Sequence, residues 1–303
     1  MMTTEAAEPV PERAARPVDA HALERVRRRL QAASPPWLHG EVARRMAERL
    51  PVVKLQPACV LDWSGPAGAS AATLQAAYPP ARQLAVVPGP LPLHEAPPWW
   101  SLRRYKPPAV TAVAEDAVAA GSAQLVWSNM DLQLQSRPQA LMARWHRAIA
   151  VDGFLMFSTL GPGSLAQLRA LYRAAGWPPP AAPLVDMHDL GDMLIEAGFA
   201  DPVMDQEVVT LTWPTPQALL AELRSLGANA DLGRYAGLRT PRWHARLLQA
   251  LQARAGASGR IGLDFEIVYG HAFRPLPRPR VAARTVVPVD DLRQLARARR
   301  RPT

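Results

Sequence analysis

The residues from Cys59 to Ala69 have the pattern of a buried strand that runs into a glycine turn and then a helix. Apolar residues precede Asp62, and Gly65 and Gly68 follow it. Glycine lets the backbone turn sharply and approach a ligand closely, while the next helix presents free N–H groups to that ligand. Doubly wound α/β proteins open a ligand site with a strand, turn and helix in this order. The pattern therefore predicts an α/β fold.

Strand and helix patterns alternate along the chain, which implies right-handed βαβ units and a parallel sheet. The expected strands lie at 58–62, 83–87, 110–113, 125–127, 154–158, 203–213 and 263–273. The expected helices lie at 23–30, 42–50, 138–149, 164–175, 187–197, 216–226 and 241–254, and Asp152-Gly153 is expected to be a turn. The last two strands are separated by helices, which is consistent with an antiparallel hairpin at the sheet edge. We predict a Rossmann-like, doubly wound, mostly parallel seven-stranded sheet with helices on both faces and helices before it.

Composition shifts suggest three parts. Residues 1–19 are polar and interrupted by prolines, and they are expected to be disordered. Residues 20–275 are expected to form one domain with a helical insertion at about 214–260, and 276–303 form a Pro/Arg-rich tail.

The formal net charge of +9 favours an acidic partner such as a nucleic acid, an anionic membrane or an acidic protein. Arginines gather at both ends, among Arg25–Arg29 and Arg293–Arg301, where a solvated arginine face is the alternative. The apolar runs are too short to span a bilayer. The first residues lack a signal-peptide pattern, and Cys59 is the single cysteine, so a cytoplasmic setting is expected. Neither cysteines nor histidines show the spacing of a metal site.

Several polar residues follow the predicted strands. The carboxyl ends of parallel strands meet at one edge of the sheet, and ligands of such folds bind there. The residues expected at this edge are Asp62, Val87, Asp116, Asn129 and Thr159.

The order of these segments resembles the class I S-adenosylmethionine-dependent methyltransferases, and within them the biotin-pathway malonyl-acyl-carrier-protein O-methyltransferases. The resemblance covers roughly 40–275 and is strongest at Leu125–Gln133 and Phe157–Leu165, with a further match at Leu223–Asn229. It implies S-adenosylmethionine as cofactor, an acidic acyl carrier protein as partner and methylation of a malonyl thioester's free carboxylate. The N-terminal helices also resemble the related complex I assembly factor branch.

The resemblance places five residues at the cofactor: Asp62, Gly65, Gly68, Asp116 and Asn129. Other roles stay open for them. The turn could be a plain connection, Asp116 a helix N-cap and Asn129 an Asx turn.

The glycine motif is incomplete, because Ser64 and Pro66 stand where two glycines are expected. The acid expected to bind the ribose hydroxyls after the second strand is missing at Val87, and Glu95 is too far along the chain. Cofactor binding is therefore expected to be weak or lost. A cofactor-less relative that binds or assembles a partner is the alternative. A nucleic-acid methyltransferase is disfavoured because Asn129-Met130-Asp131-Leu132 lacks the usual Pro-Pro-aromatic ending.

Arg137, Arg144 and Arg147 are candidates for contacting an acidic substrate, or else they solvate a helix face. Trp127 and Trp145 are expected in the core, whereas Trp99 and Trp100 could cover the pocket or pack.

Overall fold

The computed structural model describes residues 15–89 and 110–276. Its seven strands form one sheet in the order β3-β2-β1-β4-β5-β7-β6. The strands are β1 (Cys59–Asp62), β2 (Arg82–Val87), β3 (Thr111–Ala114), β4 (Ala123–Asn129), β5 (Ile149–Leu160), β6 (Ala200–Trp213) and β7 (Ile261–Phe273). The first five are parallel, and β7 pairs antiparallel with both β5 and β6. The predicted mostly parallel seven-stranded sheet and its antiparallel hairpin are confirmed.

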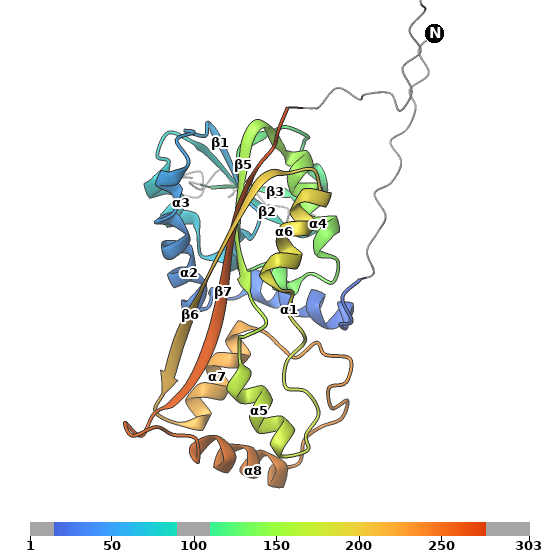
Figure 1. Ribbon diagram of the computed structural model, residues 1–303, viewed down its shortest axis with the longest axis vertical. Helices are drawn as coiled ribbons and strands as arrows, with labels where there is room; N and C mark the ends of the chain where they lie inside the picture. Colours follow the sequence, from blue (N-terminus) through green and yellow to red (C-terminus); the bar gives the residue numbers. More distant parts are fainter. Residues whose placement is uncertain (1–14, 90–109, 277–303) are drawn as a thin grey trace, which may run out of the picture.

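The helices lie close to their predicted positions and cover both faces of the sheet (Figure 1). They are α1 (Ala20–Ala32), α2 (Trp37–Ala47), α3 (Ala71–Ala77), α4 (Pro138–Ala148), α5 (Ala166–Ala174), α6 (Met187–Glu196), α7 (Pro216–Leu226) and α8 (Pro241–Gln252). Short 3-10 turns are η1 (Leu50–Val52), η2 (Gly65–Gly68), η3 (Glu115–Ala117) and η4 (Leu132–Leu134). None of the helices in the described ranges is long and apolar enough to cross a membrane.

The side chains of the central strands point alternately to the two faces of the sheet, and each face has its own hydrophobic core. Trp127 and Phe154 pack with α2 and α3, while Val126 and Leu155 pack with α4 and α6. Burial on both faces is what continuous apolar runs in parallel strands require. Trp127 and Trp145 have no exposed surface, so their prediction as core residues is confirmed.

Strand β5 is longer than predicted. It begins at Ile149 and continues through Asp152, so Asp152-Gly153 is not a turn between helix and strand. Asp152 has φ +63°, and the register with β4 shifts between Ala123 and Leu125. A local irregularity within the strand therefore accounts for the turn-like sequence.

Residues 1–19 are predicted to be disordered, and of these 1–14 lie outside the described residues. For residues 16–19 the prediction is wrong. Val18 is 8% exposed and forms a bridge with Asp231. Arg16 donates to the carbonyl oxygens of Gln133 and Gln135, each at 2.9 Å. These long-range bonds offset the entropy of ordering a short polar segment.

A group of helices extends the molecule beyond the carboxyl end of β5, at the lower end of Figure 1. Helix α5 follows β5, whereas α7 and α8 lie between β6 and β7. We call residues 161–183 and 214–262 the carboxyl-side lobe.

Candidate functional site

Three strand ends meet at the carboxyl edge of the sheet. Asp62 pairs with Trp127, which lies two residues before Asn129 on β4. Asn129 pairs with Ser158, which precedes Thr159 on β5. The pairs are parallel, as predicted, and Asp62, Asn129 and Thr159 are all buried. The sheet therefore gathers these polar groups at the edge where ligands of such folds bind.

The turn after β1 requires glycine. Gly65 has φ +54°, and a Cβ added there would lie 2.7 Å from the carbonyl oxygen of Val86. A Cβ added to Gly68 would lie 2.4 Å from Oγ of Ser64. The backbone here packs too closely for any side chain, whether or not Pro66 occupies a glycine position.

Asp62 is buried beneath this turn. Its Oδ1 accepts hydrogen bonds from the backbone N–H of Ser64 at 3.1 Å and from Oγ of Ser64 at 2.8 Å. Burial raises the pKa of Asp62 to about 7, although the bonds from Ser64 act in the opposite direction. The aspartate is therefore held close to a change of charge at neutral pH.

Asn129 connects the turn to two other elements. Its Nδ2 donates to the carbonyl oxygens of Gly68 at 2.6 Å and His39 at 2.7 Å. Its Oδ1 accepts from Oγ of Ser158 at 2.6 Å. All of its side-chain groups thus hold the turn against α2 and β5, and the geometry is not that of an Asx turn.

His39 supports the turn from α2. Nδ1 donates to the carbonyl oxygen of Ala67 at 2.7 Å, and burial lowers the pKa of the ring. The neutral ring then leaves Nε2 as an acceptor, and Nε2 has no hydrogen-bond partner. Two further buried atoms from α1, Oε1 of Gln31 and Nη2 of Arg27, also lack hydrogen-bond partners. Gln31 lies at the turn itself, because its Nε2 donates to the carbonyl oxygen of Ser64 at 2.9 Å.

A buried charge cluster lies beside the turn. Arg27 of α1 is 6% exposed, and its guanidinium contacts Asp131 at 3.2 Å and Glu115 at 3.3 Å. Arg144 of α4 contacts the same Glu115 at 2.6 Å. Burial raises the pKa of Asp131, and the Arg27 charge acts against that rise. Helix α1 is thereby attached to the ends of β3 and β4. The solvated face expected for Arg25–Arg29 is wrong for Arg27.

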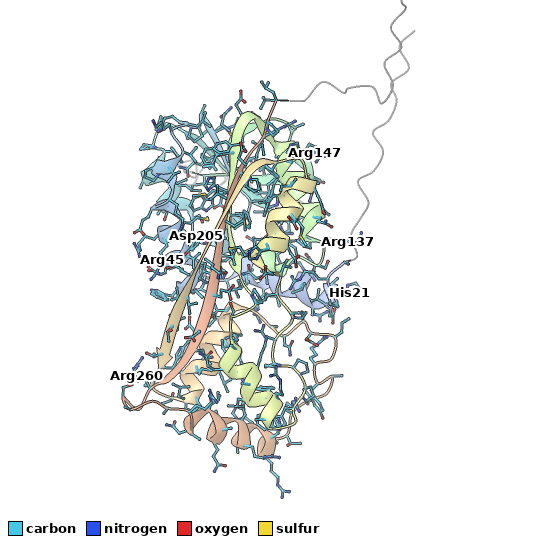
Figure 2. All side chains as sticks on the ribbon, viewed as in Figure 1. His21, Arg45, Arg137, Arg147, Asp205 and Arg260 are labelled. Carbon is cyan, nitrogen blue, oxygen red and sulfur yellow. The ribbon has the colours of Figure 1, made fainter. Side chains whose placement is uncertain are left out.

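The remaining predicted residues are dispersed. Asp116 is exposed, while its neighbour Glu115 faces the cluster. Arg137 precedes the first residue of α4, whereas Arg147 lies in its last turn, next to the start of β5 (Figure 2). A helix that returns to the amino edge of the sheet carries its last residues away from the carboxyl edge. The structure therefore does not bring Arg137, Arg144 and Arg147 together there.

Arg27, Glu115 and Asp131 are not predicted as a group by the sequence. One signal was present, because Leu23, Arg27 and Leu30 share one stripe of a helix. The partners of Arg27 lie 88 and 104 residues away, so no local pattern marks them. Glu95, Trp99 and Trp100 lie outside the described residues. Within the described ranges, no group of three His, Cys, Asp or Glu residues could hold a metal ion.

No family model matches the chain. Several curated proteins are similar to it in sequence. The malonyl-[acyl-carrier protein] O-methyltransferase of Laribacter hongkongensis is 40% identical over 252 residues, which cover 80% of this chain and 84% of the relative. The enzyme of the same name from Gallionella capsiferriformans is 37% identical, over 80% of this chain and 85% of the relative.

Among solved structures, the YcgJ protein of Bacillus subtilis has a TM-score of 0.48 at 10% identity, covering 77% of this chain and 98% of that one. A Burkholderia thailandensis 1,6-didemethyltoxoflavin-N1-methyltransferase with S-adenosylhomocysteine has a TM-score of 0.42 at 18% identity, covering 79% and 81%. The sequence relatives place this chain among the methyltransferases. It belongs to the malonyl-[acyl-carrier protein] O-methyltransferase family.

Proposed function

We propose that this chain uses S-adenosylmethionine to methylate the free carboxylate of a malonyl group carried as a thioester on an acyl carrier protein, in biotin synthesis. The supporting observation is the identity of 40% over 80% of the chain with a relative of that name. The curated relatives with this name do not favour the alternative of a cofactor-less assembly protein.

The proposed reaction needs little from the protein beyond alignment. When bound, S-adenosylmethionine supplies a methyl group on a sulfonium leaving group. A malonyl carboxylate is ionised at neutral pH, so it attacks without a general base. The oxygen–methyl bond forms as the sulfur–methyl bond breaks, which leaves an ester and a neutral thioether and releases no proton. The protein must therefore orient the two groups and exclude water.

We assign Asp62, Gly65, Gly68 and Asn129 to the cofactor site. The turn supplies backbone close to the strand ends, and Asn129 and His39 hold that backbone in place. We keep Asp116 at the adenine side, where the neighbouring Glu115 is turned inward. Arg137, Arg144 and Arg147 are not assigned to one substrate site, because Arg144 already contacts Glu115.

The polar groups at this edge suit the cofactor, but α1 lies over it. The unpartnered atoms of Gln31 and Arg27 would bind a polar ligand. However, the guanidinium of Arg27 fills the space between Glu115 and Asp131, and a nearby cavity lined by Thr159 and Leu160 has a volume of only about 10 Å³. We infer that the side chain of Arg27 would have to move for a ligand to enter between Glu115 and Asp131.

A methyl-transfer assay tests the proposal. The purified chain is incubated with S-adenosylmethionine and malonyl-carrier protein, and mass spectrometry detects the methyl ester. Acetyl-carrier protein, which has no free carboxylate, is the substrate control. We expect ester only from the malonyl form. If the folded chain makes no ester, and the Arg27→Gln variant makes none either, the proposal is wrong.

A matched pair of glycine variants tests the turn. Gly65→Val introduces a side chain at φ +54° against Val86, whereas Gly259→Val does so at φ +71° where no atom lies within 4 Å of the added Cβ. Both carry the cost of a β-branched residue at positive φ. We expect Gly65→Val to abolish methyl transfer and Gly259→Val to retain it, with circular dichroism confirming that both fold. Equal activity of the two variants would show that the turn is not part of the cofactor site.

A further inference from the structure

The carboxyl-side lobe concentrates positive charge. Residues 161–183 and 214–262 contain nine arginines and no lysine, against two carboxylates, Glu222 and Asp231. The lobe therefore carries a large excess of positive charge. A field of one sign attracts and steers a partner of the opposite sign.

The arginines of α8 lack the ion pairs that the arginines of α2 have, although the guanidinium carbon of Arg246 lies 5.8 Å from the ring centre of Trp177. In α2, Arg44 and Arg45 contact Glu41 at 2.8 Å, and Arg45 also reaches Glu207 at 2.7 Å. Helix α8 contains no acidic residue, and Arg242 and Arg246 have no ion pair with any described residue. Both are exposed and one turn apart, so they share the outer face of α8. Their charge is available to a partner.

Aromatic rings hold a third arginine beside this face. The guanidinium carbon of Arg239 lies 3.9 Å from the ring centre of Tyr235 and 4.2 Å from that of Trp243. Trp243 in turn contacts Trp177, with ring centres 5.3 Å apart. Stacked between two rings, Arg239 loses little conformational freedom when it binds an anion.

The loop before α8 exposes apolar side chains. Leu238 is 96% exposed, Leu232 is 64% exposed and Tyr235 is 48% exposed. Apolar side chains surrounded by charged ones are typical of protein–protein interfaces. A nucleic acid would use the arginines but not Leu238 and Leu232.

The lobe is also connected to the candidate site. The chain runs from Trp177, in the aromatic cluster, to Leu184 and Val185, which line the small cavity at the carboxyl edge together with Thr159. A partner bound to α8 would therefore lie beyond the carboxyl end of β5, at the same edge of the sheet as the candidate site (Figure 1).

We propose that the outer face of α8 and the loop 231–240 form the docking surface for the acidic acyl carrier protein. Arg239, Arg242 and Arg246 contact its carboxylates, and Leu238 contacts an apolar side chain between them. This proposal rests on the proposed function, which supplies the partner. In this proposal, the arginines of this surface contact the acidic substrate in place of Arg137, Arg144 and Arg147.

Charge reversal tests the surface. The double variant Arg242→Glu/Arg246→Glu adds carboxylates near the start of α8, where the helix dipole favours a negative charge at Arg242, so folding is expected to be retained. The matched control, Lys54→Glu/Arg82→Glu, makes the same change of charge at two exposed positions near the amino ends of β1 and β2. Binding of holo-carrier protein is measured by biolayer interferometry without a methyl donor.

We expect the α8 variant to weaken carrier binding on the order of tenfold or more and to remove most of its salt dependence, while the control stays close to wild type. Leu238→Ser should weaken binding without changing the salt dependence. In the methyl-transfer assay, the α8 variant should lose activity on malonyl-carrier protein, while the control variant keeps it.

The outcomes separate the two proposals. If carrier binding depends on α8 but no methyl group is transferred, the docking surface is supported and the proposed function is wrong. Methyl transfer with carrier binding unchanged by the α8 reversal, or weakened equally by the control, would overturn the docking surface alone. Wild-type protein that binds a DNA duplex through α8 and fails to bind the carrier would also overturn it.

Discussion

Arg27 donates a hydrogen bond from Nε to Oδ1 of Asp131 at 3.2 Å, which joins the first helix to the end of β4 across 104 residues of sequence. Both side chains are at most 8% exposed. A buried charge is tolerated only with a partner, so each residue depends on the other. The contact holds α1 against the carboxyl edge of the sheet, over the turn that follows β1.

Replacing Arg27 should therefore destabilise the protein more than replacing a neighbouring arginine. Arg27→Ala leaves Asp131 and Glu115 without their shared cation, and breaking a buried pair costs about 3–5 kcal/mol. Arg28→Ala is the control, because the side chain of Arg28 is 68% exposed and exposed pairs contribute little. Urea unfolding at neutral pH measures both. Similar midpoints for the two variants would contradict a structural role of the cluster.

Asn129 should be more important for stability than its partner Ser158. In Asn129→Asp, an oxygen replaces the amide nitrogen that donates to Gly68 and His39, so oxygens face each other. We expect a loss of more than ~2 kcal/mol. Ser158→Ala removes the donor to Asn129 and an acceptor of the Met130 N–H, but that N–H also donates to the carbonyl oxygen of Ser158, so the cost should be only ~1 kcal/mol. The order of the two denaturation midpoints is the test, and the reverse order would show that Asn129 does not anchor the turn.

Much of the fold could be predicted because its signals are local. Apolar runs such as Phe154–Phe157 mark strands buried on both faces, and the prolines at 35–36 separate α1 from α2. The parallel order of β1, β4 and β5 then follows from the handedness of short crossovers. The extra length of β5 was missed because Asp152-Gly153 has the composition of a turn.

The candidate site was predicted only in part. Asp62 and Asn129 follow strands, so their meeting at one edge could be inferred from topology. What each side chain contacts could not, because Arg27, Glu115 and Asp131 come from three distant segments. The spacing of Arg137 and Arg147 likewise gives no information on the direction of α4, which places these two residues at its opposite ends.

Restoring the missing ribose acid should strengthen cofactor binding. Val87 is the last residue of β2 and pairs with Ala114, beside Glu115, so a carboxylate there lies at the carboxyl edge. A hydrogen bond to a charged group contributes ~1.5–3 kcal/mol, so Val87→Glu should lower the Kd for S-adenosylhomocysteine by about tenfold or more. Val87→Gln, of similar size without the charge, should gain less. Calorimetry that finds the same Kd for all three proteins would show that this position does not face the ribose.

Stability should fall as pH rises toward neutrality because of Asp62. Its pKa is about 7 in the folded chain against an ordinary value of 3.8, so between these values the folded chain keeps a proton that the unfolded chain releases. Burial also raises the pKa of Asp131, so Asp131 acts in the same direction as Asp62. The charge of Arg27 lowers the pKa of Asp131 and makes this contribution smaller. Asp62→Asn retains an acceptor for Ser64 and removes the titration. From pH 5 to pH 8, wild type should lose about 2–3 kcal/mol more than the variant in urea unfolding. Equal losses in the two proteins would mean that Asp62 is ionised throughout this range.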